Sequence, residues 1–200
     1  VYTASFEPAQ AQEAYEEAFA LWTPLRDTRQ AAAGSRPGRI LRFAVEHPAT
    51  LDPGMVGEDV SLFLTTQLFE GLVRIGEGYN VLPAAALRWE ILDGGSRYIF
   101  YLREGMSWSD GAPLTARDFV YGFKRNLDPK TDSPVAHLLY PILNARAFRE
   151  GAVDDRDRVG VAALDDHTLE VRLEGPTAYL PYLLAHPIAC LLYTSDAADE

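Results

Sequence analysis

The sequence has a single cysteine, Cys190, among its 200 residues. One thiol cannot form a disulfide within the chain, so cysteine usage does not indicate an oxidising or a reducing compartment. Basic residues are also scarce, because 18 lysines and arginines stand against 29 acidic residues, for a formal net charge of -11. Binding to a phosphate backbone requires a basic face, and this balance therefore argues against a nucleic-acid partner.

Long hydrophobic runs are missing as well. The longest apolar stretches are too short to cross a bilayer, so no direct membrane span is expected. The chain begins at Val1 and has no basic segment followed by an apolar one, which indicates that processing or fragmentation removed its natural start. Hydrophobic residues nevertheless make up 48% of the chain, enough for a folded core rather than disorder.

The common catalytic motifs are absent too: the sequence has no GxSxG, HExxH, P-loop or Rossmann glycine pattern. Asp165, Asp166 and His167 resemble a ligand cluster, but they fall in a predicted hairpin turn, and turn chemistry accounts for them. Other candidate groups lie at spacings that do not fit a metal site or have local roles as turn former, helix cap or helix stop: His47, His137, His186, Asp110, Asp118 and Asp128. We expect no catalytic residue, no metal and no cofactor.

The segment 98–123, "YIFYLREGMSWSDGAPLTARDFVYGF", carries the densest local signals. Its alternating apolar residues predict a strand over 98–102. Thr115 and Asp118 form the pattern of a capping box, and apolar residues then recur at helical spacing as far as Leu127. Trp108 falls in the loop between the strand and the helix, where we expect it to be mostly buried and structural.

Two antiparallel hairpins are predicted elsewhere in the chain. The runs 88–92 and 97–102 are joined by "DGGS", and the runs 159–164 and 169–173 are joined by "DDHT". Both connections have the composition of tight turns between alternating strands. The sequence therefore predicts an α+β fold with several antiparallel strands.

Further elements are expected at both ends of this region. Strands are predicted at 40–45 and 72–75. A helix is expected to begin with Asp59 as its N-cap and to end with Gly71 as its C-terminal glycine. A short helix near the end of the chain would be capped by Thr177 and would contain Pro181 as an irregularity.

The order of these signals resembles the oligopeptide- and dipeptide-binding family of bacterial ABC-transporter solute-binding proteins. Four separated motifs over 39–188 carry the resemblance: "TLDPG", "QLFEGLVRIGEGYNVLPAAALRWEI", "YIFYLREGMSWSDGAPLTARDFVYGFKRNLDPKTDSP" and "LDDHTLEVRLEGPTAYLPYLLAHP". It implies part of a two-lobe, periplasmic-binding-protein-like fold with mixed α/β structure, in which antiparallel hairpins are flanked by helices. Because family members are far longer, the chain would be an N-terminal fragment.

The resemblance also implies a division of the chain into five segments. Residues 1–38 would form a helical segment and linker outside the binding module, and 39–49 would hold the first strand of the larger lobe. Residues 50–173 would form an extra family-specific domain, and 174–189 would re-enter the larger lobe. The final residues, 190–200, do not continue the family pattern and resemble a non-native tail.

Family members bind the peptide backbone as an added extended strand, and the loop after the first strand takes part. This implies ligand-binding roles for Glu46, His47 and Pro48, and for Val135, at a position where some members have an aromatic residue. The partners would be a peptide and an ABC permease complex. The full-length protein would be a monomer in the periplasm or lipid-anchored at the cell surface, and would not be an enzyme.

Two other functions stay open from the sequence. Some transcription regulators carry this module behind a DNA-binding domain, and residues 1–38 leave room for a cytoplasmic ligand sensor of that kind. A lipoprotein leader upstream would favour transport, whereas a helix-turn-helix would favour regulation. A hydrolase would rest only on scattered acidic residues.

Overall fold

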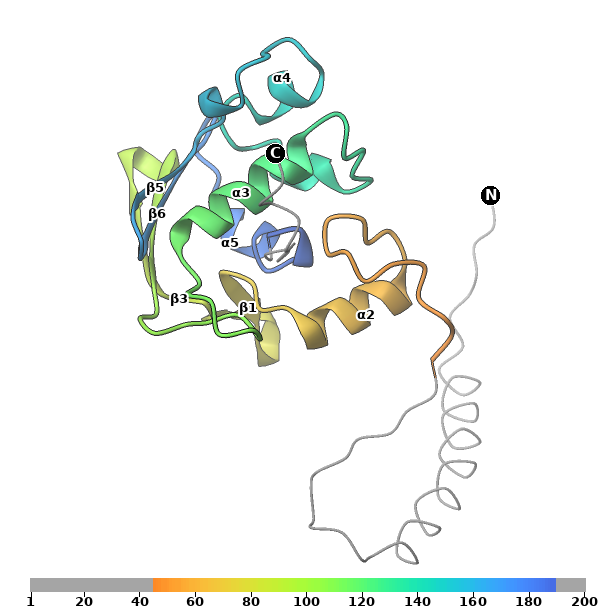
Figure 1. The fold of residues 1–200 in the computed structure, drawn as a ribbon. Helices are drawn as coiled ribbons and strands as arrows, with labels where there is room; N and C mark the ends of the chain where they lie inside the picture. The colour runs from red at the N-terminus through yellow and green to blue at the C-terminus, as the bar shows by residue number, and fades with distance from the viewer. Residues whose placement is uncertain (1–44, 190–200) are drawn as a thin grey trace, which may run out of the picture. The chain divides into compact units, whose positions relative to one another are not determined.

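The computed structural model describes residues 45–189 (Figure 1). The helical segment and linker predicted at 1–38, the tail at 190–200 and all but the last residue of the strand predicted at 40–45 lie outside these residues. Within them the main elements are α2 (Asp59–Leu68), β1 (Val73–Ile75), β2 (Val81–Pro83), β3 (Ala86–Leu92), β4 (Arg97–Leu102), α3 (Ala116–Leu127), α4 (Ala145–Arg149), β5 (Val161–Asp165), β6 (Thr168–Arg172) and α5 (Leu180–Leu183).

Both predicted hairpins are confirmed, and they join into one antiparallel sheet with the order β3-β4-β6-β5. Phe100 is paired with Trp89 on one side and with Leu169 on the other. The connection between β3 and β4 turns through Gly94 and Gly95, whose φ angles of 66° and 98° favour glycine. A second, two-stranded antiparallel sheet pairs β1 with β2.

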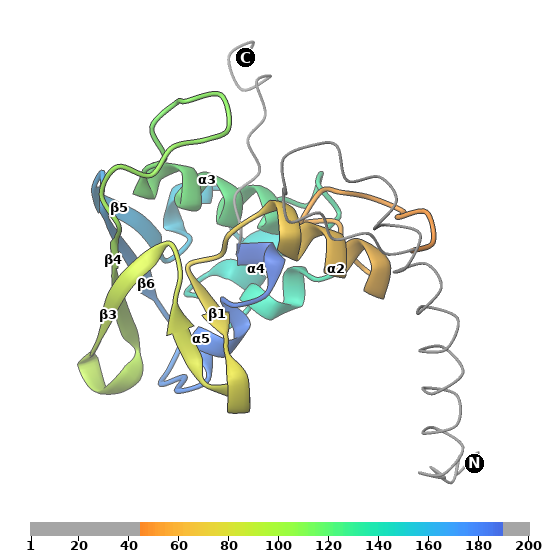
Figure 2. The ribbon, with the colours of Figure 1, turned by 90° about the horizontal axis from the view of Figure 1, so that it is seen from below.

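The hydrophobic core lies between the larger sheet and the helices on one of its faces. Figures 1 and 2 show α3 and α5 on the same side of this sheet. The alternation of β4 places Tyr98 and Phe100 in the core, where both are fully buried, and α3 contributes Phe119 and Phe123. The Tyr98 hydroxyl donates a hydrogen bond of 2.9 Å to the Thr177 carbonyl, which satisfies a polar group that burial would otherwise penalise.

The predicted capping box at the start of α3 is confirmed. The Asp118 carboxylate accepts hydrogen bonds from the Thr115 backbone N–H at 2.7 Å and from the Thr115 hydroxyl at 3.0 Å. The carboxylate also lies in the first turn, where the helix dipole favours negative charge. Asp128 follows the last helical residue in an extended conformation, as its position before Pro129 predicts.

Replacing Asp118 with alanine should lower the free energy of unfolding by about 1 kcal/mol, because the Thr115 N–H loses its acceptor. The matched variant Asp118→Asn keeps an acceptor oxygen and removes only the charge, so its loss should be smaller. Urea denaturation of both variants measures the difference. Equal stability of Asp118→Ala and the unmodified chain would show that the cap contributes nothing.

The predicted helix at 59–71 differs from the structure at both ends. Its N-cap is Glu58 rather than Asp59, because the Glu58 side chain accepts hydrogen bonds from the N–H groups of Val60 and Ser61. The helix ends at Leu68, and Phe69 is already extended, so Gly71 does not form the C-terminal cap.

The short helix near residue 180 also begins later than predicted. The N-cap of α5 is Tyr179, and Pro181 occupies the first turn, where its missing N–H costs no helical hydrogen bond. Thr177 instead places its hydroxyl against the Gly175 carbonyl at 3.0 Å. Leu180 and Leu184 are buried in the same core as β4 and α3. The assignment of 50–173 and 174–189 to different domains stays a prediction.

None of the helices between residues 45 and 189 combines the length and the hydropathy that a transmembrane span requires.

Candidate functional site

Three of the four predicted ligand-binding residues lie in the segment 45–58, which contains neither helix nor strand. Glu46 and His47 are exposed, and Pro48 is half-buried. The His47 Nδ1 atom lies 2.8 Å from the Pro48 carbonyl oxygen, so the ring folds against the backbone of the next residue. The Glu46 carboxylate and the His47 ring are therefore available at the surface of one loop.

The start of α2 holds this loop in place. The Glu58 carboxylate accepts a hydrogen bond from the Ala49 N–H at 3.2 Å, and the Ser61 hydroxyl accepts one from the Thr50 N–H at 3.1 Å. The pKa of the Glu58 carboxyl is lowered from its usual value by its hydrogen bond with the Ser61 side chain. The hydrogen bonds that it accepts from backbone N–H groups lower this pKa further. Glu58 thus links the helix start to the chain directly after Pro48.

A second set of contacts joins the same loop to the segment before Val135. The Asp52 carboxylate is bound by the Arg125 guanidinium, with its two nitrogens 2.6 and 3.2 Å from the two carboxylate oxygens. The Ser133 hydroxyl donates to the Gly54 carbonyl at 2.5 Å. Val135, half-buried and packed against the core, follows two residues after this contact. The structure brings the two predicted segments into contact, and the ligand-binding roles of their residues stay predictions.

Gly54 lies at the centre of these contacts. A Cβ atom at this position would come within 2.0 Å of the Asn126 Oδ1 atom. Asn126 is itself buried and donates a hydrogen bond of 2.8 Å to the Ile188 carbonyl. Only glycine therefore allows the loop to approach α3 this closely.

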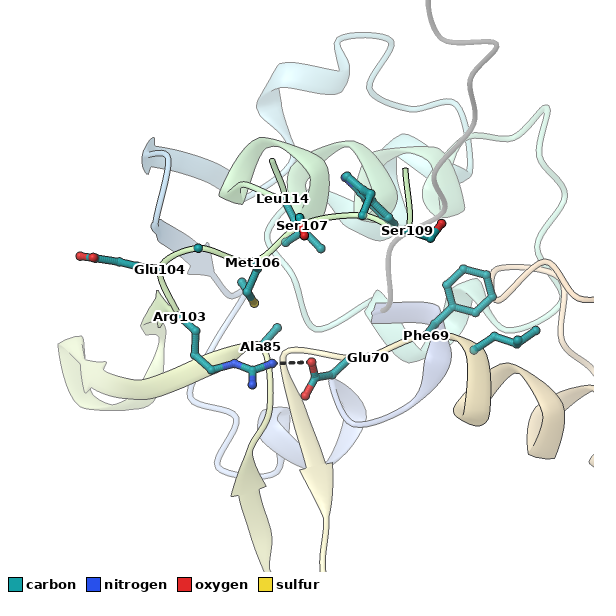
Figure 3. Close-up of a pocket in the computed structure, with 12 residues that line it drawn as sticks. Phe69, Glu70, Ala85, Arg103, Glu104, Met106, Ser107, Ser109 and Leu114 are labelled. Atoms are coloured by element: carbon teal, nitrogen blue, oxygen red, sulfur yellow. Dashed lines mark hydrogen bonds and ion pairs between the residues drawn. The ribbon is translucent and has the colours of Figure 1, made fainter. Parts of the chain in front are cut away.

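A pocket of about 660 Å³ lies at the other end of α2 (Figure 3). Phe69, Met106 and Leu114 supply apolar surface, and Arg103 and Glu70 form an ion pair at its edge, while the Glu104 side chain points away. Trp108 also lines this pocket, and it packs against the hydrophobic core with only a minor part of its surface exposed, in line with the expectation that it is mostly buried.

A further pocket of about 770 Å³ lies between α2, β1 and α5. Leu68, Phe69 and Glu70 line both pockets, so the connection from α2 to β1 separates them. No sequence motif marks either pocket, because each is assembled from segments far apart in the chain. Among residues 45–189, no group of three or more histidine, cysteine, aspartate or glutamate side chains is placed to hold a metal ion.

His186 lines the second pocket and accepts a hydrogen bond from the Ile188 N–H at 3.1 Å through Nδ1. Partial burial lowers the pKa of His186 from its usual 6.5, and the nearby charge of His137 lowers it further. A protonated Nδ1 could not accept the Ile188 N–H. The folded state therefore favours the neutral ring.

This arrangement predicts a pH dependence of stability. The unfolded chain binds the His186 proton below about pH 6.5 and the folded chain binds it only at lower pH, so the free energy of unfolding should fall as the pH drops below about 6.5. The variant His186→Asn keeps an acceptor and should lose part of this dependence, whereas His167→Gln, at an exposed turn, should retain it. Urea midpoints between about pH 7.5 and 5.5 measure the effect, and identical pH profiles for all three proteins would contradict it.

Comparison with known proteins places these features in a family. A family model described as bacterial extracellular solute-binding proteins, family 5, middle region, matches residues 80–200. The probable deoxycholate-binding periplasmic protein YgiS of Escherichia coli (strain K12) is 54% identical over 143 residues, which are 70% of this chain and 26% of that protein. The oligopeptide-binding protein OppA of Bacillus subtilis (strain 168) is 40% identical over 140 residues, which are 69% of this chain and 25% of that protein.

Solved structures show the same likeness. The murein tripeptide binding protein MppA of Escherichia coli matches with a TM-score of 0.72 and 34% identity, over 76% of this chain and 30% of its own. Listeria monocytogenes OppA bound to peptide matches with a TM-score of 0.71 and 33% identity, over 74% of this chain and 29% of its own. The chain spans about a quarter of the length of the curated relatives it matches. It belongs to the bacterial extracellular solute-binding proteins of family 5.

Proposed function

We propose that the complete protein captures a peptide outside the cytoplasm and delivers it to an ABC importer, and that the present chain forms part of the binding protein. The observation that supports this most directly is the match, at 33% identity, to the structure of Listeria monocytogenes OppA bound to peptide. The relatives named above are binding proteins, and the role proposed here is binding without catalysis. The protein would act as a monomer in the periplasm or at the cell surface.

The loop 45–58 suits a binding wall of this kind. It is held at Asp52, Gly54 and Glu58, while Glu46 and His47 remain exposed in an irregular segment. A peptide bound as an added strand offers backbone groups and charged termini, which such a loop can meet with its own backbone and with the Glu46 carboxylate. Because the loop is fixed at several points, little of its conformational entropy would be lost when a ligand binds.

A steroid acid is a second candidate ligand. The relative with 54% identity is named as a probable deoxycholate-binding protein, whereas two peptide-binding relatives, OppA of Bacillus subtilis and OppA of Salmonella typhimurium, are 40% and 41% identical. Deoxycholate is a rigid, mostly apolar anion, so it would need an apolar cavity and few backbone hydrogen bonds. A peptide would therefore need hydrogen bonds from the loop 45–58, whereas deoxycholate would need mainly apolar contacts.

Thermal denaturation of the protein encoded by the complete reading frame tests both candidates. A ligand that binds only the folded state raises Tm. We expect a rise with a pool of short peptides and none with deoxycholate below its micellar concentration. A rise with deoxycholate alone would replace the peptide with a steroid acid, and no rise with either would overturn the proposed function.

Variants of the loop test the predicted ligand-binding residues in the same assay. Glu46→Ala and His47→Ala should reduce the rise in Tm that the peptide pool causes and leave the Tm of the free protein unchanged, because both side chains are exposed. The matched control Glu77→Ala changes an exposed acidic residue outside the loop and should leave the rise intact. If all three variants behave alike, Glu46 and His47 do not contact the ligand.

A further inference from the structure

The last turn of α3 contacts the loop 45–58, which carries three of the predicted ligand-binding residues. The Arg125 guanidinium binds the Asp52 carboxylate through two nitrogens, 2.6 and 3.2 Å from the two carboxylate oxygens. Only 23% of the Arg125 side chain and 22% of the Asp52 side chain are exposed, so the pair is shielded from much of the water that weakens a surface ion pair. A contact of this geometry fixes the orientation of the carboxylate as well as its distance.

Asp52 carries this constraint into the turn that follows it. Its Oδ1 atom accepts a hydrogen bond from the Gly54 N–H at 2.9 Å, and its carbonyl accepts one from the Met55 N–H at 3.0 Å. The same carboxylate therefore shapes the turn and attaches it to Arg125. Any change in the position of this carboxylate would move the turn with it.

The segment before Val135 is attached to the same turn. The Ser133 hydroxyl donates to the Gly54 carbonyl, and Ser133 is only 3% exposed. From the other side, the Arg149 guanidinium donates to the Asp128 carbonyl at 2.9 Å. The spacing between the loop and Val135 is thus set at Gly54, which Asp52 and Ser133 hold from different sides.

The Asp52–Arg125 pair suits a geometric role better than a stabilising one. Removing two charged groups from water costs free energy that offsets much of their attraction, so a partly buried ion pair is weak evidence for stability. Its two-point contact nevertheless restricts the loop to one arrangement. A loop that is already ordered loses less conformational entropy when a ligand binds.

We propose that Arg125 is a positioning residue of the candidate site, which acts through Asp52 to hold the loop 45–58 in the conformation that binds the ligand. Glu46 and His47 would contact the ligand, whereas Arg125 would not. This inference rests on the proposed function for the identity of the ligand, a peptide. The ordering of the loop by Arg125 can be measured without any ligand.

Three variants of the protein encoded by the complete reading frame isolate the pair. Arg125→Gln removes one charge, and Asp52→Asn removes the other while it keeps an Oδ1 acceptor for the Gly54 N–H. The third variant combines both changes. Calorimetric titration with a pool of short peptides measures the dissociation constant, and amide hydrogen exchange without ligand measures the order of the loop.

Lys124→Gln is the matched control, because it removes another ion pair from the neighbouring position of α3. The Lys124 ammonium lies 2.7 Å from the carboxylate of Asp157, which is outside the loop. This variant tests for any general effect of weakening the contacts of α3. Its dissociation constant should stay within about twofold of that of the unmodified protein, as is usual for a distant, independent site.

We expect Arg125→Gln and Asp52→Asn each to raise the dissociation constant about tenfold, and the double variant to raise it no further, because all three remove the same contact. The Gly54 amide should exchange about tenfold faster in Arg125→Gln, while the amides of β4 keep their rates. If Arg125→Gln does not fold, Arg125→Lys replaces it, since lysine keeps the charge but not the two-nitrogen contact. It should show the same two changes to a smaller degree.

An unchanged dissociation constant for Arg125→Gln would overturn the proposal. So would a loss in the double variant equal to the product of the single losses, or an equal loss in Lys124→Gln. If the unmodified protein binds no peptide, the proposed function fails, and the exchange of Gly54 still decides whether Arg125 orders the loop. Equal exchange in Arg125→Gln and in the unmodified protein would show that it does not.

Discussion

The 200-residue chain alone should bind short peptides no more tightly than about millimolar, whereas the complete protein should bind them far more tightly. A dissociation constant of 1 mM corresponds to about -4 kcal/mol. Association costs about 4 kcal/mol or more in translational and rotational freedom, before any ordering of the ligand. The contacts must exceed this cost before binding becomes measurable.

If the predicted ligand-binding residues are correct, the described part of the chain supplies one wall for such contacts. Glu46 and His47 are exposed on the loop 45–58, and Val135 lies beyond Ser133 on the adjoining segment. A peptide on an open wall keeps its other side in water, where a hydrogen bond contributes about 1 kcal/mol or less. A few bonds of this strength cannot offset the cost of association, so tight binding requires the opposing lobe that the family resemblance implies.

Calorimetric titration of the 200-residue chain with a pool of short peptides measures this directly. No saturable heat is expected at peptide concentrations up to about millimolar. The Glu46→Ala variant serves as the control, because it should give the same trace as the unmodified chain if no site is formed. Micromolar binding that Glu46→Ala removes would show that a single wall suffices.

The largest loss of stability is expected from Phe119→Ala. Phe119 is fully buried on α3 in the cluster that contains Tyr98, Phe100 and Phe123. Truncating a buried phenylalanine removes its transfer free energy and leaves a cavity, which together cost about 3–5 kcal/mol. Because the whole stability of a domain is about 5–15 kcal/mol, this single change should leave the chain marginally folded or unfolded.

Tyr121→Ala provides the matched control, since Tyr121 lies on the same helix but is exposed. It should change the free energy of unfolding by about 0.5 kcal/mol or less. Urea denaturation of both variants, followed by circular dichroism, compares the losses. If Phe119→Ala and Tyr121→Ala destabilise the chain equally, the core does not lie between α3 and the sheet as described.

Local chemistry was sufficient to predict the elements whose signals are complete within a short stretch. The β3–β4 connection needs positive φ angles, and "DGGS" provides glycines for them. Thr115 and Asp118 mark the start of α3 because both partners of the capping box lie three residues apart. The alternation of Tyr98 and Phe100 identified the buried face of β4 for the same reason.

Elements decided by contacts distant in sequence were predicted less well. Asp59 is a good N-cap by residue type, but Glu58 takes this role while its carboxylate also binds Ala49 across the loop. Thr177 was expected to cap α5, yet its backbone is bonded to the β3–β4 hairpin, with its N–H donating to the Gly95 carbonyl in the connection and its carbonyl accepting from the Tyr98 hydroxyl. Hydrogen bonds between residues distant in sequence cannot be predicted from a local sequence pattern.

The candidate site could likewise be predicted only in part from the sequence. The loop with Glu46 and His47 was identified through the family resemblance, not from chemistry visible in those residues. Its attachment through Gly54 and Ser133 joins residues 79 positions apart, which no local pattern predicts. Trp108 packs against the core as expected, but the pocket that it also lines could not be predicted, because the end of α2, Ala85 and the loop between β4 and α3 form it together.

Calorimetric titration of the protein encoded by the complete reading frame with a pool of short peptides tests the central claim most directly. Two lobes that close over a ligand should give saturable binding with a dissociation constant of about 1 μM or below, equivalent to about -8 kcal/mol or better. The same titration should show a markedly weaker constant for Glu46→Ala. The absence of any saturable heat from peptides, with the complete protein folded, would contradict the proposal that this protein binds peptides.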